Sequence, residues 1–251
     1  MGKKFKDYYD LECARLLAGK LKSADSTFPD RAFVERVARE LGGSAEGTAF
    51  SARQDIFALA LEKHLPEHYP DAVALLTHIL GPPLPGPEGM FTYGWWLWPV
   101  GRYIERNALA DHEVTLAFIY ELTQRFTGEF AVRPLLRDAP GATLAVLHTW
   151  AQDSDVHVRR CASEGVRINL PWTQKLTVAL DHFDAYRTIL DRLNRAPEKF
   201  VQKSVGNNLN DLMKNDAEKA WIIIEAWRAD SPGAETDWII RHGTRSLGKK
   251  R

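Results

Sequence analysis

The sequence of 251 residues has little of what marks several protein classes. It holds two cysteines, Cys13 and Cys161, too few for a disulfide framework and in no metal-binding spacing, so we expect two buried thiols. No run of about 18 apolar residues occurs, which predicts that no helix spans a membrane. The basic start at residues 1–6 is followed by no apolar segment, so we expect no signal peptide and a cytoplasmic protein.

The sequence also lacks an excess of charge and the common catalytic motifs. Its 33 Lys and Arg residues balance 33 Asp and Glu residues, which argues against a protein that coats nucleic acid indiscriminately. No glycine-rich phosphate loop, Gly-x-Ser-x-Gly elbow or His-Glu-x-x-His pattern is present. His64 and His68 are four residues apart, but Pro66 between them breaks the helix that a metal pair needs. We therefore expect no metal and no cofactor.

What the sequence does contain is apolar spacing of the helical type along almost its whole length. Alternating strand patterns are nearly absent, and prolines and glycines separate the helical runs. The spacing predicts helices over residues 7–22, 30–42, 51–63, 68–80, 95–107, 111–126, 129–137, 142–152, 156–167, 173–181, 183–195, 198–213, 217–229 and 235–247.

A short segment recurs in the second half of the chain. It begins at His157, again at Phe200 after 43 residues, and at Trp238 after a further 38 residues. A weaker copy begins at Phe130. In each copy the second position is apolar, and the fourth position is basic: Arg133, Arg160, Lys203 and Arg241.

A period of about 40 residues is typical of stacked helical pairs of the HEAT type. We therefore predict an all-α, HEAT-like helical-repeat solenoid with a concave face. It forms a single domain over residues 1–251, with an N-terminal helical part at 1–93 and clearer repeats at 94–251. The basic residue at one repeat position becomes a row of cations, which suits a phosphate backbone. Ion pairs within the repeats are the alternative use of these cations.

Four segments of the chain together resemble the alkylpurine DNA glycosylases of the AlkC/AlkD superfamily, and the AlkC branch most. These segments are ELTQRFTGEFAVRP at 121–134, HVRRCASEG at 157–165, LPW at 170–172 and NNLND at 207–211. The resemblance covers nearly the whole chain. Some AlkC-like chains carry a C-terminal immunoglobulin-like domain that contacts DNA. The sequence ends at Arg251 without one, so we expect this chain to lack that domain.

The resemblance implies a monofunctional DNA glycosylase for cationic alkylated bases in base excision repair. N3-methyladenine is an example of such a base, and the AlkC branch is also associated with N3-methylcytosine. Such a base leaves as a neutral molecule, so no general acid is needed. What remains is to stabilise the oxocarbenium-like sugar and to position water, and carboxylates do both. The implied partner is double-stranded DNA with alkylated bases. We expect a monomer that associates with the nucleoid through DNA.

Three acidic residues fall in the matched segments, and we take Asp211, Glu164 and Glu129 as the catalytic candidates. Each has a plainer structural alternative. Glu129 suits the N-terminal dipole of a helix, and Glu164 suits an ion pair with Arg160 four residues earlier. Asp211 ends a run of Asn and Asp residues that opposes helix propensity, which favours a function but also fits a helix C-terminal cap.

Aromatic and basic residues complete the predicted site. Trp172 follows Pro171 in a loop, where it suits stacking on the damaged nucleotide or attraction of a cationic base; packing between repeats is the alternative. Arg133, Arg160, Lys203 and Arg241 are predicted to contact the DNA backbone. Two further hypotheses stay open: a non-enzymatic HEAT-type scaffold for a protein or for DNA, and a catalytically dead relative that binds DNA.

Overall fold

The computed structural model describes residues 4–42 and 49–247, so residues 248–251, where the sequence ends, lie outside it. Within those ranges every regular element is a helix and none is a strand, which confirms the all-α prediction. No helix in them is long and apolar enough to cross a membrane. The chain divides into two compact units: unit 1 is Met1–Leu84 with Gly89–Thr127, and unit 2 is Pro85–Glu88 with Gly128–Arg251.

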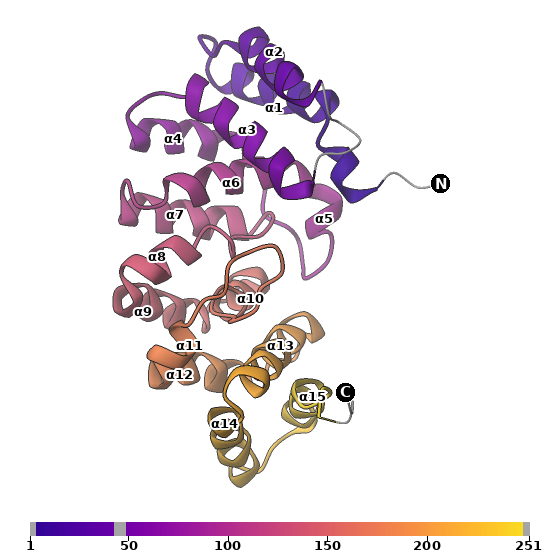
Figure 1. The fold of residues 1–251 in the computed structure, drawn as a ribbon, viewed down its shortest axis with the longest axis vertical. Coiled ribbons are helices and arrows are strands. Elements are labelled where there is room, and N and C mark those ends of the chain that lie inside the picture. Colours follow the sequence, from indigo (N-terminus) through magenta and orange to yellow (C-terminus); the bar gives the residue numbers. More distant parts are fainter. Residues whose placement is uncertain (1–3, 43–48, 248–251) are drawn as a thin grey trace. The chain divides into compact units, whose positions relative to one another are not determined.

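Unit 1 is built from two rows of helices (Figure 1). α1, α4 and α7 pack in one row, and α2, α3 and α6 pack in the other. Its elements are η1 (Phe5–Tyr8), α1 (Leu11–Ala24), α2 (Asp30–Leu41), α3 (Phe50–His64), α4 (Tyr69–Ile79), α5 (Met90–Tyr93), η2 (Trp95–Leu97), α6 (Trp98–Asn107) and α7 (His112–Thr123).

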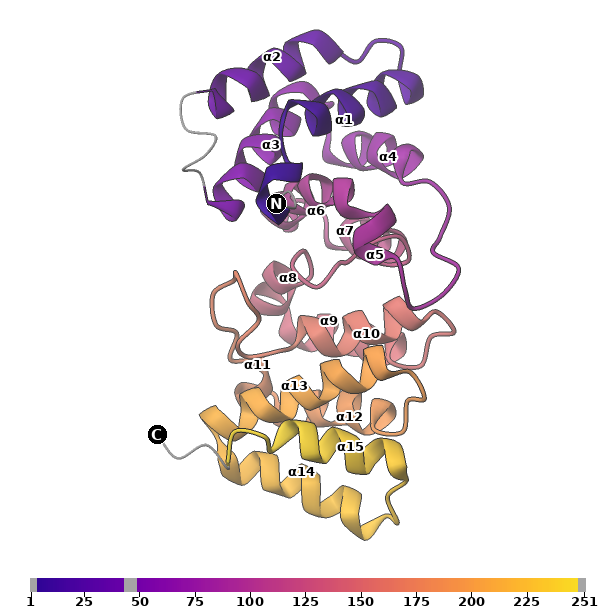
Figure 2. The ribbon, with the colours of Figure 1, turned by 90° about the vertical axis from the view of Figure 1, so that its right-hand side faces the viewer.

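Unit 2 repeats this two-row plan. Its elements are α8 (Arg133–Asp138), α9 (Pro140–Trp150), α10 (Val156–Gly165), α11 (Val178–Asp181), α12 (Phe183–Leu193), α13 (Lys199–Asn215), α14 (Ala217–Ala229) and α15 (Ala234–Gly243). Figure 2 shows α10, α13 and α15 running side by side, and we call these three helices the site layer. α9, α12 and α14 form the row behind it (Figure 1).

Capping residues and apolar spacing fix the helices of the site layer. Asp155 accepts hydrogen bonds from the backbone N–H groups of His157 and Val158 and so caps α10, which starts at Val156 as the predicted helix over residues 156–167 does. Along α13, Val201, Val205 and Leu209 recur at intervals of four residues and are fully buried. These residues form an apolar face of the helix, while Ser204, Asn208 and Asp211 place buried polar side chains at other positions of α13.

Two glycines let α13 and α15 approach closely. A Cβ added at Gly243 of α15 would lie 2.6 Å from the Cβ of Leu209 on α13. A Cβ added at Gly206 of α13 would lie 2.8 Å from the ring of His242 on α15. Because the Leu209 Cβ is fixed to the backbone, side-chain rotation does not relieve the first contact, and the spacing of the two helices depends on Gly243.

We expect Gly243→Ala to lower the free energy of unfolding by about 1–3 kcal/mol, the usual cost of overpacking a core. The matched control is Gly141→Ala in α9, where an added Cβ meets nothing within 4 Å. That variant is expected to gain up to about 1 kcal/mol, because Ala loses less conformational freedom in a helix. Denaturant unfolding of both variants measures the difference, and equal stabilities would contradict the close approach.

Candidate functional site

The three predicted catalytic acids come together in unit 2 as members of one ionic chain. Glu129 lies in the turn before α8, Glu164 lies in the last turn of α10, and Asp211 lies within α13. The three residues are between 4% and 6% exposed. Two guanidiniums, those of Arg160 and Arg167, lie between them. We call these five groups the carboxylate array.

Arg160 joins the first two acids of the carboxylate array. Its Nη1 lies 3.3 Å from both carboxylate oxygens of Glu129, and its Nη2 lies 3.6 Å from Oε1 of Glu164. The guanidinium also covers the ring of Phe200, 5.0 Å from its centroid. The side chain of Arg160 is 14% exposed, so it is largely enclosed by its two carboxylates.

Arg167 joins Glu164 to the third acid, Asp211. Its Nη1 donates to Oε1 of Glu164 at 2.7 Å, and its Nε donates to Oδ2 of Asp211 at 3.0 Å. The hydroxyl of Ser204 donates to the second oxygen of Glu164 at 2.6 Å. Both oxygens of Glu164 are therefore engaged within the protein.

The array shifts the pKa values of two carboxyls in opposite directions. Burial acts to raise the pKa of Glu164, but Arg160, Arg167 and the Ser204 hydroxyl outweigh it, so the pKa is lowered. Burial also dominates at Glu129; Arg160 opposes it and the nearby Glu164 adds to it, so the pKa of Glu129 is raised. Glu164 is therefore the more strongly held anion of the two.

Asp211 differs from the other two acids in how its two oxygens are engaged within the described part of the chain. Its Oδ2 accepts from Arg167 and from the backbone N–H of Asn169, at 3.0 and 3.2 Å. Among the described residues, its Oδ1 accepts no hydrogen bond. The alternative that Asp211 caps a helix is wrong, because α13 continues to Asn215.

The loop at 166–177 holds the predicted stacking residue. Trp172 is 67% exposed and has a φ of +64°, a left-handed conformation that is unfavourable for a bulky side chain. Such strain persists where the surroundings fix the backbone, and it gathers at binding sites. The loop is fixed at Asn169, which bonds to Asp211, and at Leu176, whose N–H donates to the Ile168 carbonyl at 3.1 Å.

Arg133 is also an anchor of this loop. Its guanidinium donates to the carbonyls of Gly165, Arg167 and Gln174 at 3.1, 2.8 and 2.7 Å. The residue is 1% exposed. The prediction that Arg133 contacts the DNA backbone is therefore wrong, because its charge is buried under the loop and its donors are used on carbonyls.

The other three members of the predicted basic row divide into two kinds. Arg160 follows the ion-pair alternative, since it lies between two carboxylates. Lys203 on α13 and Arg241 on α15 are exposed on neighbouring helices of the site layer, so their contact with phosphates stays a prediction.

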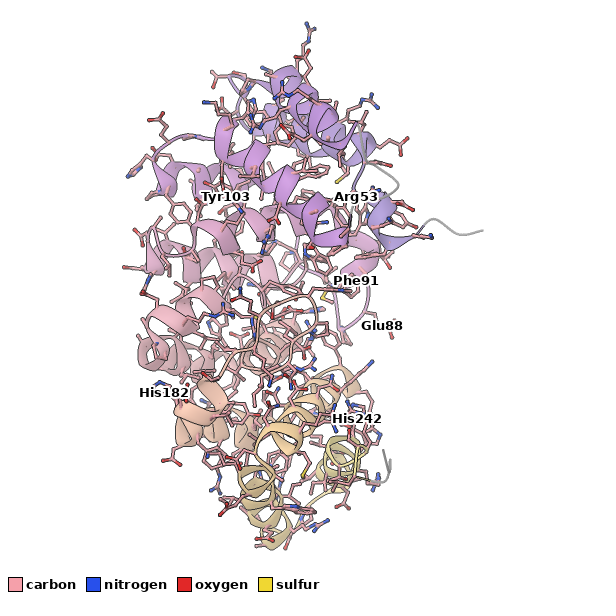
Figure 3. All side chains as sticks on the ribbon, viewed as in Figure 1. Arg53, Glu88, Phe91, Tyr103, His182 and His242 are labelled. Carbon is pink, nitrogen blue, oxygen red and sulfur yellow. The ribbon has the colours of Figure 1, made fainter. Side chains whose placement is uncertain are left out.

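His242 lies on α15 beside these exposed cations, on the side of unit 2 opposite to His182 (Figure 3). Burial, Arg245 and Lys203 lower its pKa. A local excess of positive charge therefore surrounds the imidazole, as expected of a surface that attracts an anion.

Sequence reasoning missed two members of the site. Arg167 is three residues after Glu164, a spacing that permits an ion pair, but nothing in the sequence shows that it also reaches Asp211. Ser204 occupies the repeat position after Lys203 and gives no signal of its contact with Glu164. Among the described residues, no group of three or more His, Cys, Asp and Glu side chains is placed to hold a metal ion.

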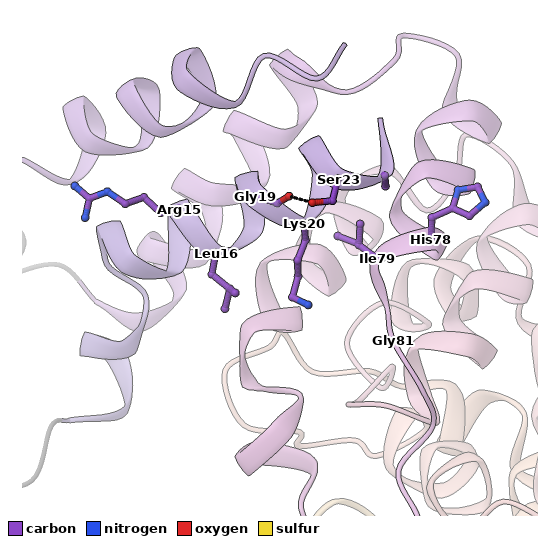
Figure 4. A pocket seen from close by; sticks show the side chains of 9 residues that line it. Arg15, Leu16, Gly19, Lys20, Ser23, His78, Ile79 and Gly81 are labelled. Atoms are coloured by element: carbon purple, nitrogen blue, oxygen red, sulfur yellow. Dashed lines mark hydrogen bonds between the residues drawn. The ribbon is translucent and has the colours of Figure 1, made fainter. Parts of the chain in front are cut away.

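A separate open cleft of about 850 Å³ lies in unit 1, along α1 and the end of α4. Figure 4 shows Arg15 and His78 at its opposite ends, pointing away from one another. The ammonium of Lys20 is 4.5 Å from the ring centroid of Trp96. The polar groups of this cleft do not converge on one point, which distinguishes it from the carboxylate array.

Comparison with known proteins points to one family. The family model described as DNA alkylation repair enzyme matches residues 127–247. The uncharacterized protein YhaZ of Bacillus subtilis is 31% identical over 98% of this chain and 65% of its own length. The Pseudomonas fluorescens alkylpurine DNA glycosylase AlkC, bound to DNA containing an abasic site analog, is 28% identical with a TM-score of 0.83.

The chain is similar to members of the AlkC/AlkD superfamily. The likeness to AlkC extends over 98% of this chain and 65% of the AlkC chain. This chain therefore spans 65% of the length of AlkC and of YhaZ. AlkD2 from Streptococcus mutans, 16% identical with a TM-score of 0.54, shares the fold. The family match covers almost all of unit 2 and contains the whole carboxylate array and Trp172.

The lowered pKa of Glu164 gives a test in the free protein. We expect Glu164→Gln to cost about 1–3 kcal/mol of stability at neutral pH, because two buried guanidiniums lose a charged partner. A folded-state pKa below the ordinary 4.5 means that this contribution is present above 4.5 and is lost as pH falls through the folded value.

Denaturant unfolding of the wild type and of Glu164→Gln across this pH range measures the difference. The difference in unfolding free energy between the wild type and Glu164→Gln should narrow as the wild-type Glu164 carboxyl takes up its proton. A gap that stays constant into acid would show that Glu164 is not held as an anion.

Proposed function

We propose that this chain is a monofunctional DNA glycosylase that hydrolyses the N-glycosidic bond of cationic alkylated bases, such as N3-methyladenine and N3-methylcytosine, in base excision repair. The observation that carries the proposal is the buried carboxylate of Asp211, which is held at Oδ2 and whose Oδ1 accepts no hydrogen bond from the described residues. The match of residues 127–247 to the family model for DNA alkylation repair enzymes and the likeness to a DNA-bound AlkC support it.

The chemistry needs carboxylates rather than a general acid. A base alkylated to a cation departs as a neutral molecule, and positive charge develops on the sugar as the glycosidic bond breaks. Oδ1 of Asp211 is free to face that charge or to accept a hydrogen bond from the attacking water. A fixed anion in a buried site stabilises such a charge more than an anion in water does.

Glu164 and Glu129 act behind Asp211 in this proposal. Both oxygens of Glu164 are engaged by Arg167, Arg160 and Ser204, and those of Glu129 face Arg160. Their negative charges add to the field at the sugar without needing direct contact. In this proposal Asp211 contacts the substrate, and Glu164 and Glu129 support it through their charge.

Trp172 and the exposed cations bind the substrate. The exposed ring of Trp172 offers a π-face to the damaged nucleotide or to its cationic base. Lys203 and Arg241 contact phosphates without reading sequence. The protein acts as a monomer on double-stranded DNA.

A scaffold that binds a protein or DNA without catalysis is the competing function. Such a scaffold has no need of an aspartate that is only 4% exposed, since burial of a charged group is costly. Release of free base separates the two proposals directly.

We expect Asp211→Asn to lower the rate of base release from methylated DNA by about 10²–10³, because Asn keeps the shape but not the charge that stabilises the sugar cation. DNA affinity and the fold should stay close to the wild type. The control is Asp230→Asn, which changes an exposed acid paired with Arg195 and should leave the rate unchanged.

A uracil-containing duplex is the control substrate. Uracil is a neutral base that departs as an anion unless it is protonated, so it is a poorer leaving group and should not be released. Full activity of Asp211→Asn would remove Asp211 from the mechanism, and efficient release of uracil would refute the requirement for a charged base.

Salt dependence tests the exposed cations. Each phosphate contact contributes about −0.9 to the log–log slope of affinity against salt, so Lys203→Ala should make the slope shallower by about one. Arg192→Ala, an exposed cation on α12 in the row behind the site layer, should leave the slope unchanged. An equal effect of both substitutions would show that the site layer is not the DNA surface.

A further inference from the structure

We propose that Arg167 is a positioning residue: one guanidinium holds Glu164 and Asp211 side by side as anions and sets the direction in which Asp211 faces the substrate. This inference rests on the proposed glycosylase function. It concerns a residue that contacts two of the predicted catalytic acids.

The first argument is the geometry of the guanidinium. Arg167 follows the end of α10 and is 8% exposed. It places one nitrogen on each acid, Nη1 on Glu164 at 2.7 Å and Nε on Asp211 at 3.0 Å. Arg presents its donors in a rigid planar fork, so these two contacts fix the separation and orientation of the two carboxylates.

The second argument is that Asp211 depends on Arg167 more than Glu164 does. Glu164 keeps Arg160 and Ser204 if Arg167 is removed. Asp211 forms an ion pair with Arg167 and with no other described residue. Two buried carboxylates without the cation between them repel one another, and one of them then takes up a proton.

The other titratable groups near Asp211 do not replace Arg167. Tyr186 on α12 faces it, and burial raises the pKa of this phenol, which stays neutral. Arg245 lies after α15 and donates to the carbonyl of His242 and to Asn207. It interacts with Asp211 across a distance rather than by an ion pair.

Arg167 also donates a hydrogen bond to the backbone of the loop that carries Trp172. Its Nη2 donates to the carbonyl of Asn169 at 3.4 Å, while the N–H of Asn169 donates to Asp211. Arg167 and Asp211 therefore both hydrogen-bond to the backbone of Asn169, three residues before Trp172. The same guanidinium couples the position of the loop to that of the acid.

The test is the pH dependence of base release by Arg167→Ala under single-turnover conditions on methylated duplex DNA. At neutral pH we expect the rate to fall by about a hundredfold. The deficit should shrink as pH is raised, because alkaline pH restores the second anion. Added guanidinium chloride should restore activity more than sodium chloride of equal ionic strength does.

Two further variants make the result specific. Arg159→Ala removes the neighbouring guanidinium of α10, which is paired with Glu198 and lies outside the carboxylate array. It should keep the wild-type pH profile and gain nothing from guanidinium. Arg167→Lys keeps a cation without the fork, so it should keep the wild-type pH profile at a reduced rate, and it provides a test if the Ala variant does not fold.

The outcomes separate this inference from the function on which it rests. A wild type that releases no base from methylated DNA refutes the glycosylase function and this inference together. If the wild type is active, a different result overturns this inference alone. That result is an Arg167→Ala variant that loses thermal stability and rate but keeps the wild-type pH profile and is not rescued by guanidinium. That result would make Arg167 a merely structural residue.

Discussion

The candidate site depends on two guanidiniums that separate three buried carboxylates. Without Arg160 and Arg167, Glu129, Glu164 and Asp211 would be like charges in a poorly solvated space, and burial would protonate them. With the cations between them, the pKa of Glu164 is lowered, while that of Glu129, which has one such partner, is raised. Among the described residues, Oδ1 of Asp211 is the one oxygen of these three carboxylates that accepts no hydrogen bond within the protein, and we propose that it faces the substrate.

The helical repeat serves this arrangement by bringing distant segments to one place. Glu164 and Arg167 come from the end of α10, Asp211 comes from the interior of α13, and Glu129 comes from the turn before α8. Close packing in the site layer fixes these positions, and glycine at Gly206 and Gly243 permits the approach of α13 and α15. Buried Arg133 ties the Trp172 loop to the same frame through three carbonyls. Arg133, which the sequence analysis assigned to the DNA backbone, instead holds this loop in place.

The sequence predicted the helices well because apolar spacing and breakers are local signals. Asp155 caps α10 as expected, and the range 198–213 lies close to the observed Lys199–Asn215. Residues 173–177 were predicted as helix but form a loop, where Arg133 and Arg137 bond the Gln174 carbonyl. The three acids were found from family motifs. Of their guanidinium partners, the sequence offered Arg160 as an alternative ion pair for Glu164, but it did not predict Arg167 or the contact of Arg160 with Glu129. A basic residue at a fixed repeat position looks alike whether it faces solvent, as Lys203 does, or a buried carboxylate, as Arg160 does.

The central claim is that the carboxylate array stabilises positive charge at the sugar. The most direct measurement compares the affinity for duplex DNA that carries a cationic pyrrolidine in place of one sugar with the affinity for the same duplex carrying a neutral tetrahydrofuran. We expect the wild type to bind the cationic analogue at least about a hundredfold more tightly, as an enzyme binds a mimic of its transition state. Asp211→Asn should lose most of that preference. Equal affinity of the wild type for the two duplexes would contradict the account.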